Sequence, residues 1–274
     1  MELGYLTHVG GPGSPRDTYR DTVELAVAAE AAGFTSFWVA QHHAGEAQGQ
    51  LPSPLVLLGA VAQATSRIRL GTGVIAAALE DPLRLAEDAA VLDVLSGERL
   101  ELGVGAGSDP AASALFDRDH ERRHADCAAV VDELRELLGG PTLVPDAPGL
   151  LDRMWWATGS RRGVDAAAAR GIGVISGRPQ GAAPDLERYW ARAVAEPRVA
   201  VSRLIRVGEP AAEVAARLRA DPALPWASAL LVQTQPSRTD LAGHLRTLAV
   251  AAEAVSAVRE PVAAGPRRTA GWTA

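Results

Sequence analysis

The sequence predicts an α/β fold, a single (β/α)8 TIM barrel, on three observations. The stretch 66–107 contains two apolar, β-rich runs, and the segment between them repeats its apolar residues at helical spacing, which indicates one βαβ unit. The same alternation continues along the chain until eight strands and eight helices are counted. A length of 274 residues also suits one barrel domain of this kind. We therefore expect a closed parallel sheet covered by helices.

Short apolar runs predict the strands, and longer periodic runs predict the helices between them. The expected strands span residues 3–7, 36–40, 68–75, 100–104, 154–157, 173–176, 199–207 and 229–233, and the expected helices span 16–32, 55–64, 83–95, 118–138, a fifth completed by 165–170, 185–195, 210–220 and 238–255. Asp81 and Pro82 suit a helix start, whereas Gly33 and Gly97 suit helix ends. The barrel is expected over residues 1–258, followed by a mobile tail over 259–274.

Composition narrows the classes of function. All 27 basic residues are arginine, so enzymes that need a lysine amine, such as Schiff-base aldolases and pyridoxal-phosphate enzymes, are excluded. A net charge of −6 argues against a nucleic-acid partner. The single Cys127 allows no internal disulfide, and we read neither a signal-like segment nor an apolar run of membrane length. These features favour a cytoplasmic protein without membrane contact.

Two histidines leave the second predicted strand at its carboxyl end. In a barrel, the loops at this end build active sites. Adjacent residues on an extended chain point to opposite sides, so His42 and His43 should not chelate one metal, and one of them should face the barrel mouth. From position alone, both a catalytic histidine and a hydrogen-bonding loop pair are open interpretations.

Glycine-rich turns follow two further strands. The GxGxG run at 103–107 has the wrong spacing and place for a dinucleotide fingerprint, so its glycines more simply make room at the mouth. The turn from Thr158 through Gly159 and Ser160 to Arg161 opens a helix, and its N–H groups, hydroxyl and dipole suit a phosphate. The alternative is a plain helix cap by Ser160 with arginines facing solvent.

One string matches a zinc motif. His120, Glu121 and His124 satisfy HExxH, which places two imidazoles and a carboxylate at helical spacing. No third ligand is evident nearby, and the segment starts a strongly charged helix. We therefore favour a solvated, salt-bridged helix face, predict no metal, and keep a zinc hydrolase only as an alternative.

The segments GTG at 71–73, DPLRLAEDAAVLDVLSGERLELGVG at 81–105 and FWVAQHH at 37–43 resemble the bacterial luciferase-like monooxygenases, in particular a short FMN-dependent branch. The resemblance implies that His42 lies beside the flavin and assists proton transfer. It implies a cis peptide bond between Gly73 and Val74 that supports the flavin ring, close to Gly105. It also implies that the flavin phosphate lies on the turn formed by Thr158, Gly159, Ser160 and Arg161.

Two residues depart from the family pattern. Gln41 replaces the usual glutamate before the histidines, and Ala106 stands where many relatives have a phosphate-neutralising arginine. The resemblance implies an FMN-dependent monooxygenase or oxidoreductase that uses molecular oxygen, reduced FMN from a separate flavin reductase and a small organic substrate, and that works as a homodimer. A deazaflavin-dependent hydride-transfer enzyme and a non-catalytic barrel subunit with a decayed flavin site are the alternatives.

Overall fold

The strands of the computed structural model, which describes residues 1–43, 45 and 49–259, form one parallel sheet in the order β3-β2-β1-β9-β8-β7-β6-β5-β4. Pairing of β3 with β5 closes this sheet into a barrel. The strands are β1 (Glu2–Thr7), β2 (Ser36–Val39), β3 (Arg69–Thr72), β4 (Ile75–Ala76), β5 (Leu100–Gly105), β6 (Met154–Ala157), β7 (Gly173–Ser176), β8 (Val199–Arg206) and β9 (Ala229–Gln235). The predicted eight-stranded barrel is confirmed, with its third strand divided into β3 and β4.

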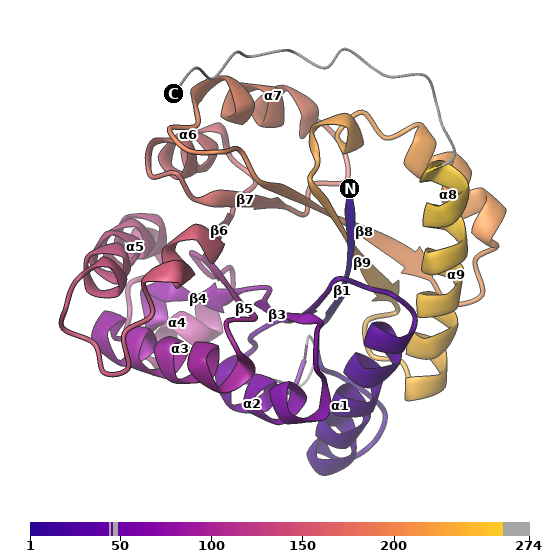
Figure 1. The fold of residues 1–274 in the computed structure, drawn as a ribbon, viewed down its shortest axis with the longest axis horizontal. Helices are drawn as coiled ribbons and strands as arrows, with labels where there is room; N and C mark the ends of the chain where they lie inside the picture. The colour runs from indigo at the N-terminus through magenta and orange to yellow at the C-terminus, as the bar shows by residue number, and fades with distance from the viewer. Residues whose placement is uncertain (44, 46–48, 260–274) are drawn as a thin grey trace.

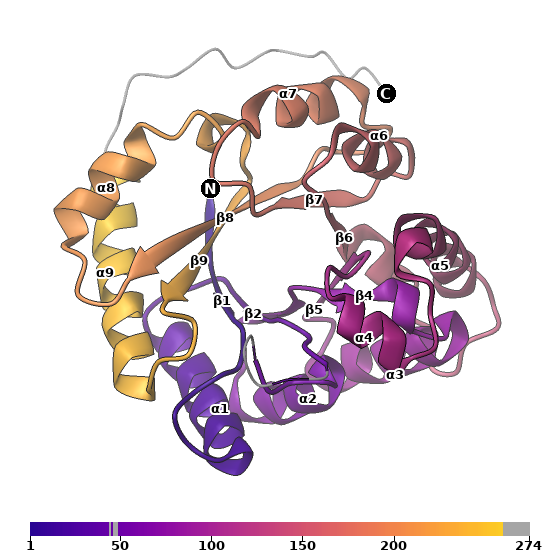
Figure 2. The ribbon, with the colours of Figure 1, turned by 180° about the vertical axis from the view of Figure 1, so that it is seen from behind.

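Helices surround the strands on all sides, as Figure 1 and the view from behind in Figure 2 show. They are α1 (Pro15–Ala31), α2 (Pro54–Ala64), α3 (Pro82–Ser96), α4 (Pro110–Leu115), α5 (Arg123–Gly139), α6 (Arg161–Ala169), α7 (Ala183–Arg192), α8 (Ala211–Arg219) and α9 (Leu241–Arg259). Short 3₁₀ turns are η1 (Ala77–Leu79), η2 (His120–Arg122), η3 (Pro148–Arg153) and η4 (Leu224–Trp226). Each barrel strand therefore ends in a loop at the same face of the molecule.

Local sequence signals set several helix ends. Asp81 caps α3 because its carboxylate accepts the backbone N–H of Arg84, and Pro82 follows in the first turn. Gly97 ends the helix with φ 69°, and Gly33 follows α1 with φ 83°, both in the left-handed region that glycine adopts freely. The predicted starts and ends of these helices are confirmed.

The prediction of a single helix over residues 118–138 was wrong. The carboxylate of Asp119 accepts the backbone N–H of Glu121 and starts the 3₁₀ turn η2, and α5 begins only at Arg123. The short helix α4 precedes it and was not predicted, although Asp109 caps it. A capping side chain within a helical sequence pattern can divide the helix. Its oxygen accepts backbone N–H groups that would otherwise donate to the carbonyls of a continuous helix. Residues 260–274 of the predicted tail lie outside the described residues.

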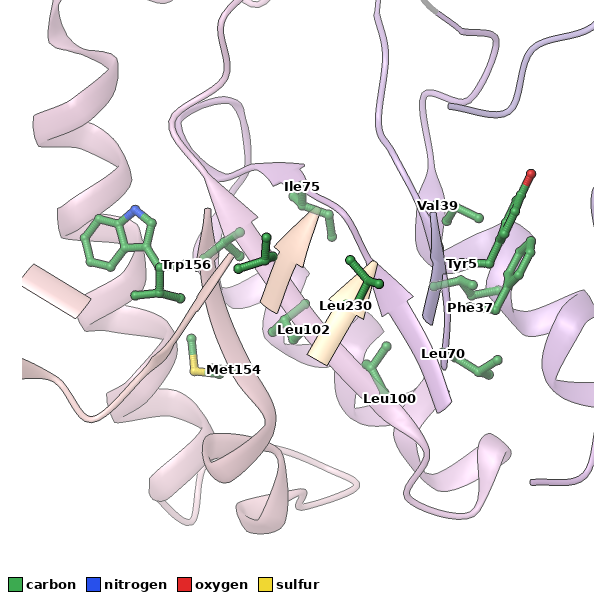
Figure 3. Packing of buried hydrophobic residues seen from close by; sticks show 14 of the residues in the cluster. Tyr5, Phe37, Val39, Leu70, Ile75, Leu100, Leu102, Met154, Trp156 and Leu230 are labelled. Carbon is green, nitrogen blue, oxygen red and sulfur yellow. The ribbon is translucent and has the colours of Figure 1, made fainter. Parts of the chain in front are cut away.

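The core has two layers. Between the strands and the helices lie most of the buried apolar side chains, including the Tyr5 and Phe37 rings seen in Figure 3. Inside the barrel a smaller cluster contains Trp38 and Trp155, whose rings meet edge to face with centroids 5.9 Å apart. A Cβ on Gly71 would lie 2.0 Å from the Trp38 ring, so the indole needs glycine there. These rings therefore fill part of the barrel interior.

A buried ion pair ties α3 to the strand β5 and to the turn before β6. The Asp93 carboxylate is buried, and it accepts two hydrogen bonds from the Arg153 guanidinium, at 2.5 and 2.9 Å. Arg153 also donates to the backbone carbonyl of Leu100. Removal of either charge would leave the other buried without its partner.

One described helix, α9, contains an 18-residue stretch, Leu241–Val258, with the length and apolar composition of a membrane span. The expectation that no such segment exists was therefore wrong on those two criteria. In the barrel, α9 lies alongside α8 and α1 and buries side chains such as Leu248 and Val255 against the core. A core helix of a barrel meets the same two criteria because its inner face is apolar.

Candidate active site

A chain of hydrogen bonds crosses the barrel mouth between the ends of β1, β2 and β9. His8 Nδ1 and His42 Nε2 lie 2.8 Å apart, and their rings are stacked with centroids 5.1 Å apart. On its other side, His8 Nε2 lies 2.9 Å from Gln233 Oε1. The Gln233 amide nitrogen in turn donates to the Ser202 hydroxyl. His42 therefore faces the mouth, as predicted for one histidine of the pair.

The direction of these bonds fixes the proton positions on both rings. Because the Gln233 amide nitrogen donates to Ser202, its carbonyl oxygen faces His8 and requires a proton on His8 Nε2. The neutral ring of His8 then accepts at Nδ1, so His42 carries its proton on Nε2. His42 Nδ1 is left with a free lone pair, the form needed to accept a proton.

Both rings are held neutral. Burial is the main cause that lowers the pKa of His42 to about 4; the neighbouring His8 and His43 contribute in the same direction, and Asp109 opposes them. Burial also lowers the pKa of His8, although its hydrogen bond to Gln233 opposes the change. A second positive charge beside the first would be unfavourable, so the two imidazoles act as one base that takes one proton.

His43 lies apart from this chain. Its ring packs edge to face on Phe116, which follows α4, with centroids 4.7 Å apart. Its Nε2 atom is buried and has no hydrogen-bond partner. The two adjacent histidines thus contact different groups, as expected for residues that cannot chelate one metal.

Gln41 supports the wall beside the histidines. Its amide nitrogen donates to the Glu80 carboxylate at 2.8 Å, and its oxygen accepts the backbone N–H of Ala76 in β4 at 2.7 Å. A glutamate at this position would place its carboxylate next to that of Glu80, and the two negative charges would repel each other. The glutamine therefore suits the Glu80 that stands opposite it, and its side chain holds β4 in place.

The same wall of the mouth is apolar and made of small residues, and the Val74 carbonyl accepts the backbone N–H of Gln41 at 3.3 Å. The peptide bond between Gly73 and Val74 is cis, as predicted, and it lies where β3 gives way to β4. A Cβ on Gly105 would lie 2.9 Å from Val74 Cγ2 and 3.7 Å from the Ala157 Cβ, so these three residues form one surface. Val74 and Ala157 are half-buried and pack on the inner cluster, which presents a smooth apolar wall to the mouth.

The glycine-rich turn after β6 caps the next helix. Ser160 Oγ accepts the backbone N–H of Gly163 at 3.1 Å and is the cap of α6, while Thr158 Oγ1 accepts the backbone N–H of Ser160. Ser160 therefore has the capping role that sequence reasoning left open, and its hydroxyl also lies 3.4 Å from Thr158 Oγ1. Arg161 is 69% exposed, with Nε 3.4 Å from the Asp185 carboxylate.

A second arginine at this turn was missed by the sequence analysis. Arg178 follows β7, and its guanidinium lies 3.3 Å from the backbone carbonyl of Gly159 and 2.8 Å from Asp185. Because β6 and β7 are neighbours in the sheet, their carboxyl ends bring Gly159 and Arg178 together. The only sequence signal was an arginine two residues beyond a strand. The turn therefore carries two guanidinium groups and one carboxylate.

The HExxH string has no matching geometry. His120 lies in η2 and its Nδ1 is 3.0 Å from the Ser113 hydroxyl, whereas His124 lies in the first turn of α5. Within residues 1–43, 45 and 49–259, no group of three or more His, Cys, Asp or Glu side chains is placed to hold a metal ion. Arg122 instead pairs with Asp126 at 3.3 Å, as a salt-bridged helix surface would.

Comparison with known proteins agrees with the fold. The family model "Luciferase-like monooxygenase" matches residues 1–270. Among curated proteins, 4-hydroxyprotoasukamycin monooxygenase of Streptomyces nodosus subsp. asukaensis is 37% identical over 122 residues, 44% of this chain and 32% of that protein. The chain spans only 26% to 35% of the length of the first three curated relatives.

Solved structures share the whole barrel. The monooxygenase RslO1 of Streptomyces bottropensis has a TM-score of 0.80 at 20% identity, covering 94% of this chain and 99% of its own. The oxygenating constituent of 3,6-diketocamphane monooxygenase from Pseudomonas putida, in complex with FMN, has a TM-score of 0.63 at 19% identity and covers 81% and 72%. An F420-dependent secondary alcohol dehydrogenase has a TM-score of 0.71 at 16% identity and covers 94% and 99%.

Proposed function

Because this chain belongs to the luciferase-like monooxygenase family, we propose that it is an FMN-dependent monooxygenase that oxidises a small organic substrate with molecular oxygen. One observation carries the proposal: the imidazole of His42 and the glycine-rich turn capped by Ser160 lie at the same rim of the barrel. Monooxygenase relatives support an oxidoreductase or monooxygenase in general. The specific cofactor, a separate flavin reductase as the source of electrons, the homodimer and a cytoplasmic location are our proposals.

The residues at the mouth fit a flavin-type cofactor. A flat ring needs an apolar surface, and Val74, Gly105 and Ala157 supply one. A phosphate needs donors and positive charge, and the first turn of α6, the Ser160 hydroxyl and the Arg178 guanidinium supply them. When bound, the reduced cofactor supplies the electrons for oxygen chemistry. The remaining steps fall to the protein.

His42 would accept a proton during the reaction. Its free Nδ1 can take a proton from a group in the mouth, and the positive charge that results is shared with His8 through the 2.8 Å bond. Gln233 keeps both rings in the required tautomer because it accepts from His8 and cannot itself take up the proton. The indole rings of Trp38 and Trp155 fill the barrel interior beneath the histidines and would exclude water from it.

Cofactor binding tests the proposal. We expect wild-type protein to bind FMN more tightly than riboflavin, measured by fluorescence titration. The double variant Ser160→Ala, Arg178→Ala should lose about 1.5–3 kcal/mol of a charge-assisted interaction, so FMN should weaken roughly ten- to a hundredfold and riboflavin little. Arg192→Ala, an exposed ion-paired arginine on α7, is the matched control and should change neither. Equal losses for both flavins would place the phosphate elsewhere.

The role of the base has its own test. His42→Ala should slow oxidation of reduced FMN by oxygen, followed by stopped-flow absorbance, by roughly a hundredfold, the effect typical of a lost general base. FMN affinity should stay near that of wild type. His43→Ala removes the adjacent imidazole, which contacts Phe116 instead of the mouth, and should react at the wild-type rate. Equal rates for the two variants would refute the assignment to His42.

A deazaflavin is the second candidate cofactor. The similar F420-dependent alcohol dehydrogenase covers almost the whole chain, and the same apolar wall and turn would accept either ring system. Titration with F420 beside FMN separates the two. Tight binding of F420 without binding of FMN would make the protein a hydride-transfer enzyme, and binding of neither would favour a non-catalytic barrel.

A further inference from the structure

A cavity of about 260 Å³ lies outside the barrel between α1, α9 and the end of β1. The two helices lie side by side in Figure 1, where α9 follows the last strand and α1 the first. Side chains alternate along β1, so Thr7 faces this cavity while His8 faces the barrel mouth. The polar side chains on its wall are Thr7, Asp17, Thr18, Asp21, Thr22, Thr239, Asp240 and His244. None of them takes part in the proposed function.

One hydroxyl on this wall has no partner. Thr18 is 7% exposed, and its Oγ1 forms no hydrogen bond. The neighbouring Thr22 hydroxyl, by contrast, donates to the Thr18 carbonyl at 2.8 Å. A Cβ on Gly11 would lie 3.4 Å from Thr18 Oγ1, so the glycine leaves space directly beside the unpartnered hydroxyl. Buried polar atoms in folded proteins almost always have a hydrogen-bond partner, and a ligand in this cavity could supply the partner of the Thr18 hydroxyl.

The charge on the wall is negative. Asp17, Asp21 and Asp240 bring three carboxylates, and Arg20 pairs with the first two at 3.3 and 2.9 Å. Asp240 Oδ1 accepts the backbone N–H of Gly243 at the start of α9, at 2.8 Å. Burial lowers the pKa of His244 to about 4, so the imidazole adds no positive charge at neutral pH. Three carboxylates thus face the Arg20 guanidinium, and a second guanidinium, that of Arg238, donates to the backbone carbonyl of Gly11 on the same wall at 3.3 Å.

We propose that this cavity is a binding site for a small organic ammonium compound. The ammonium group would lie between the Asp21 and Asp240 carboxylates and donate to the Thr18 hydroxyl, and the side chains of Leu25 and Leu241 on the same wall would contact a short alkyl chain. A metal ion is a poorer fit, because the described part of the chain contains no group of three or more metal-ligating side chains. The site is independent of the cofactor proposal.

Calorimetry with n-butylammonium tests the site, with n-butanol and butyrate as neutral and anionic probes of equal length. We expect saturable binding of butylammonium alone, with a Kd at or below about 1 mM. Asp21→Asn should weaken this binding about tenfold or more. Asp88→Asn, which also removes an exposed helix carboxylate that pairs with an arginine, is the matched control and should leave it unchanged.

Thr18→Val gives a second measurement. The valine keeps the shape and removes the unpartnered hydroxyl, so without butylammonium the variant should unfold at the same or a higher temperature than wild type. It should nevertheless bind butylammonium about tenfold more weakly. Equal binding of butanol, no saturable binding of butylammonium, or equal weakening by Asp88→Asn would overturn the proposal.

Discussion

His244 should make the protein less stable in acid. The side chain is 7% exposed, its Nδ1 lies 2.8 Å from the Tyr5 hydroxyl, and burial lowers its pKa from 6.5 to about 4. The unfolded chain therefore takes up this proton first as the pH falls below about 6.5. The neutral His244 ring therefore makes its full contribution to the free energy of unfolding above about pH 6.5, and this contribution is lost as the pH falls towards 4. Since a tenfold change in proton affinity corresponds to about 1.4 kcal/mol, the loss reaches at most about 3 kcal/mol.

His244→Asn isolates this contribution because asparagine can still accept the Tyr5 hydroxyl but does not titrate. We expect the free energy of unfolding, measured by urea titration at pH 7, 6, 5 and 4, to fall less steeply in the variant than in wild type. The difference between the two curves should grow to about 3 kcal/mol at pH 4. His124→Asn, at an exposed position on α5, should follow the wild-type curve. Parallel curves for wild type and His244→Asn would refute the reasoning.

Four further predictions concern the barrel and its surface. Asp93→Asn should cost about 3–5 kcal/mol of unfolding free energy in urea, because it leaves a buried guanidinium without its charge partner. Gly49→Ala should shift the imidazole NMR signals of His42, since its Cβ would lie 2.1 Å from the His8 carbonyl oxygen and 2.4 Å from the His42 ring. Gly59→Ala, with nothing within 4 Å, should stabilise α2 by about 0.5–1 kcal/mol. Leu95→Glu, on the exposed apolar face of α3, should turn the proposed homodimer into a monomer in light scattering.

The barrel could be predicted because its strands and helices are encoded by residues that are close together in the sequence. The strands 154–157 and 173–176 were predicted with their observed bounds, since each is a short buried apolar run between turn residues. The ends of α3 follow from Asp81, Pro82 and Gly97 alone. The division of the predicted helix at 118–138 was also encoded locally, in the capping carboxylate of Asp119, but the strong periodicity that follows outweighed it.

The partners of the site were not predictable, because they meet only when the barrel closes. His8 was part of no motif, and it contacts His42, 34 residues away, and Gln233, 225 residues away. Pairing of β1 with both β2 and β9 brings the three side chains together. Their tautomers follow from that contact, so no pattern within one segment could indicate them.

The two departures from the family pattern are explained by such long-range partners. Read alone, Gln41 indicates a lost charge, but its amide bridges the Glu80 carboxylate and the β4 backbone, where a second carboxylate would be repelled. Ala106 likewise lacks a guanidinium, yet Arg178 brings one to the Gly159 turn from the end of β7. In a barrel, every strand end reaches the same rim, so a charge can come from a different strand without change to the fold. Loss of a motif residue therefore argues for a decayed site only after the whole rim has been searched for a replacement.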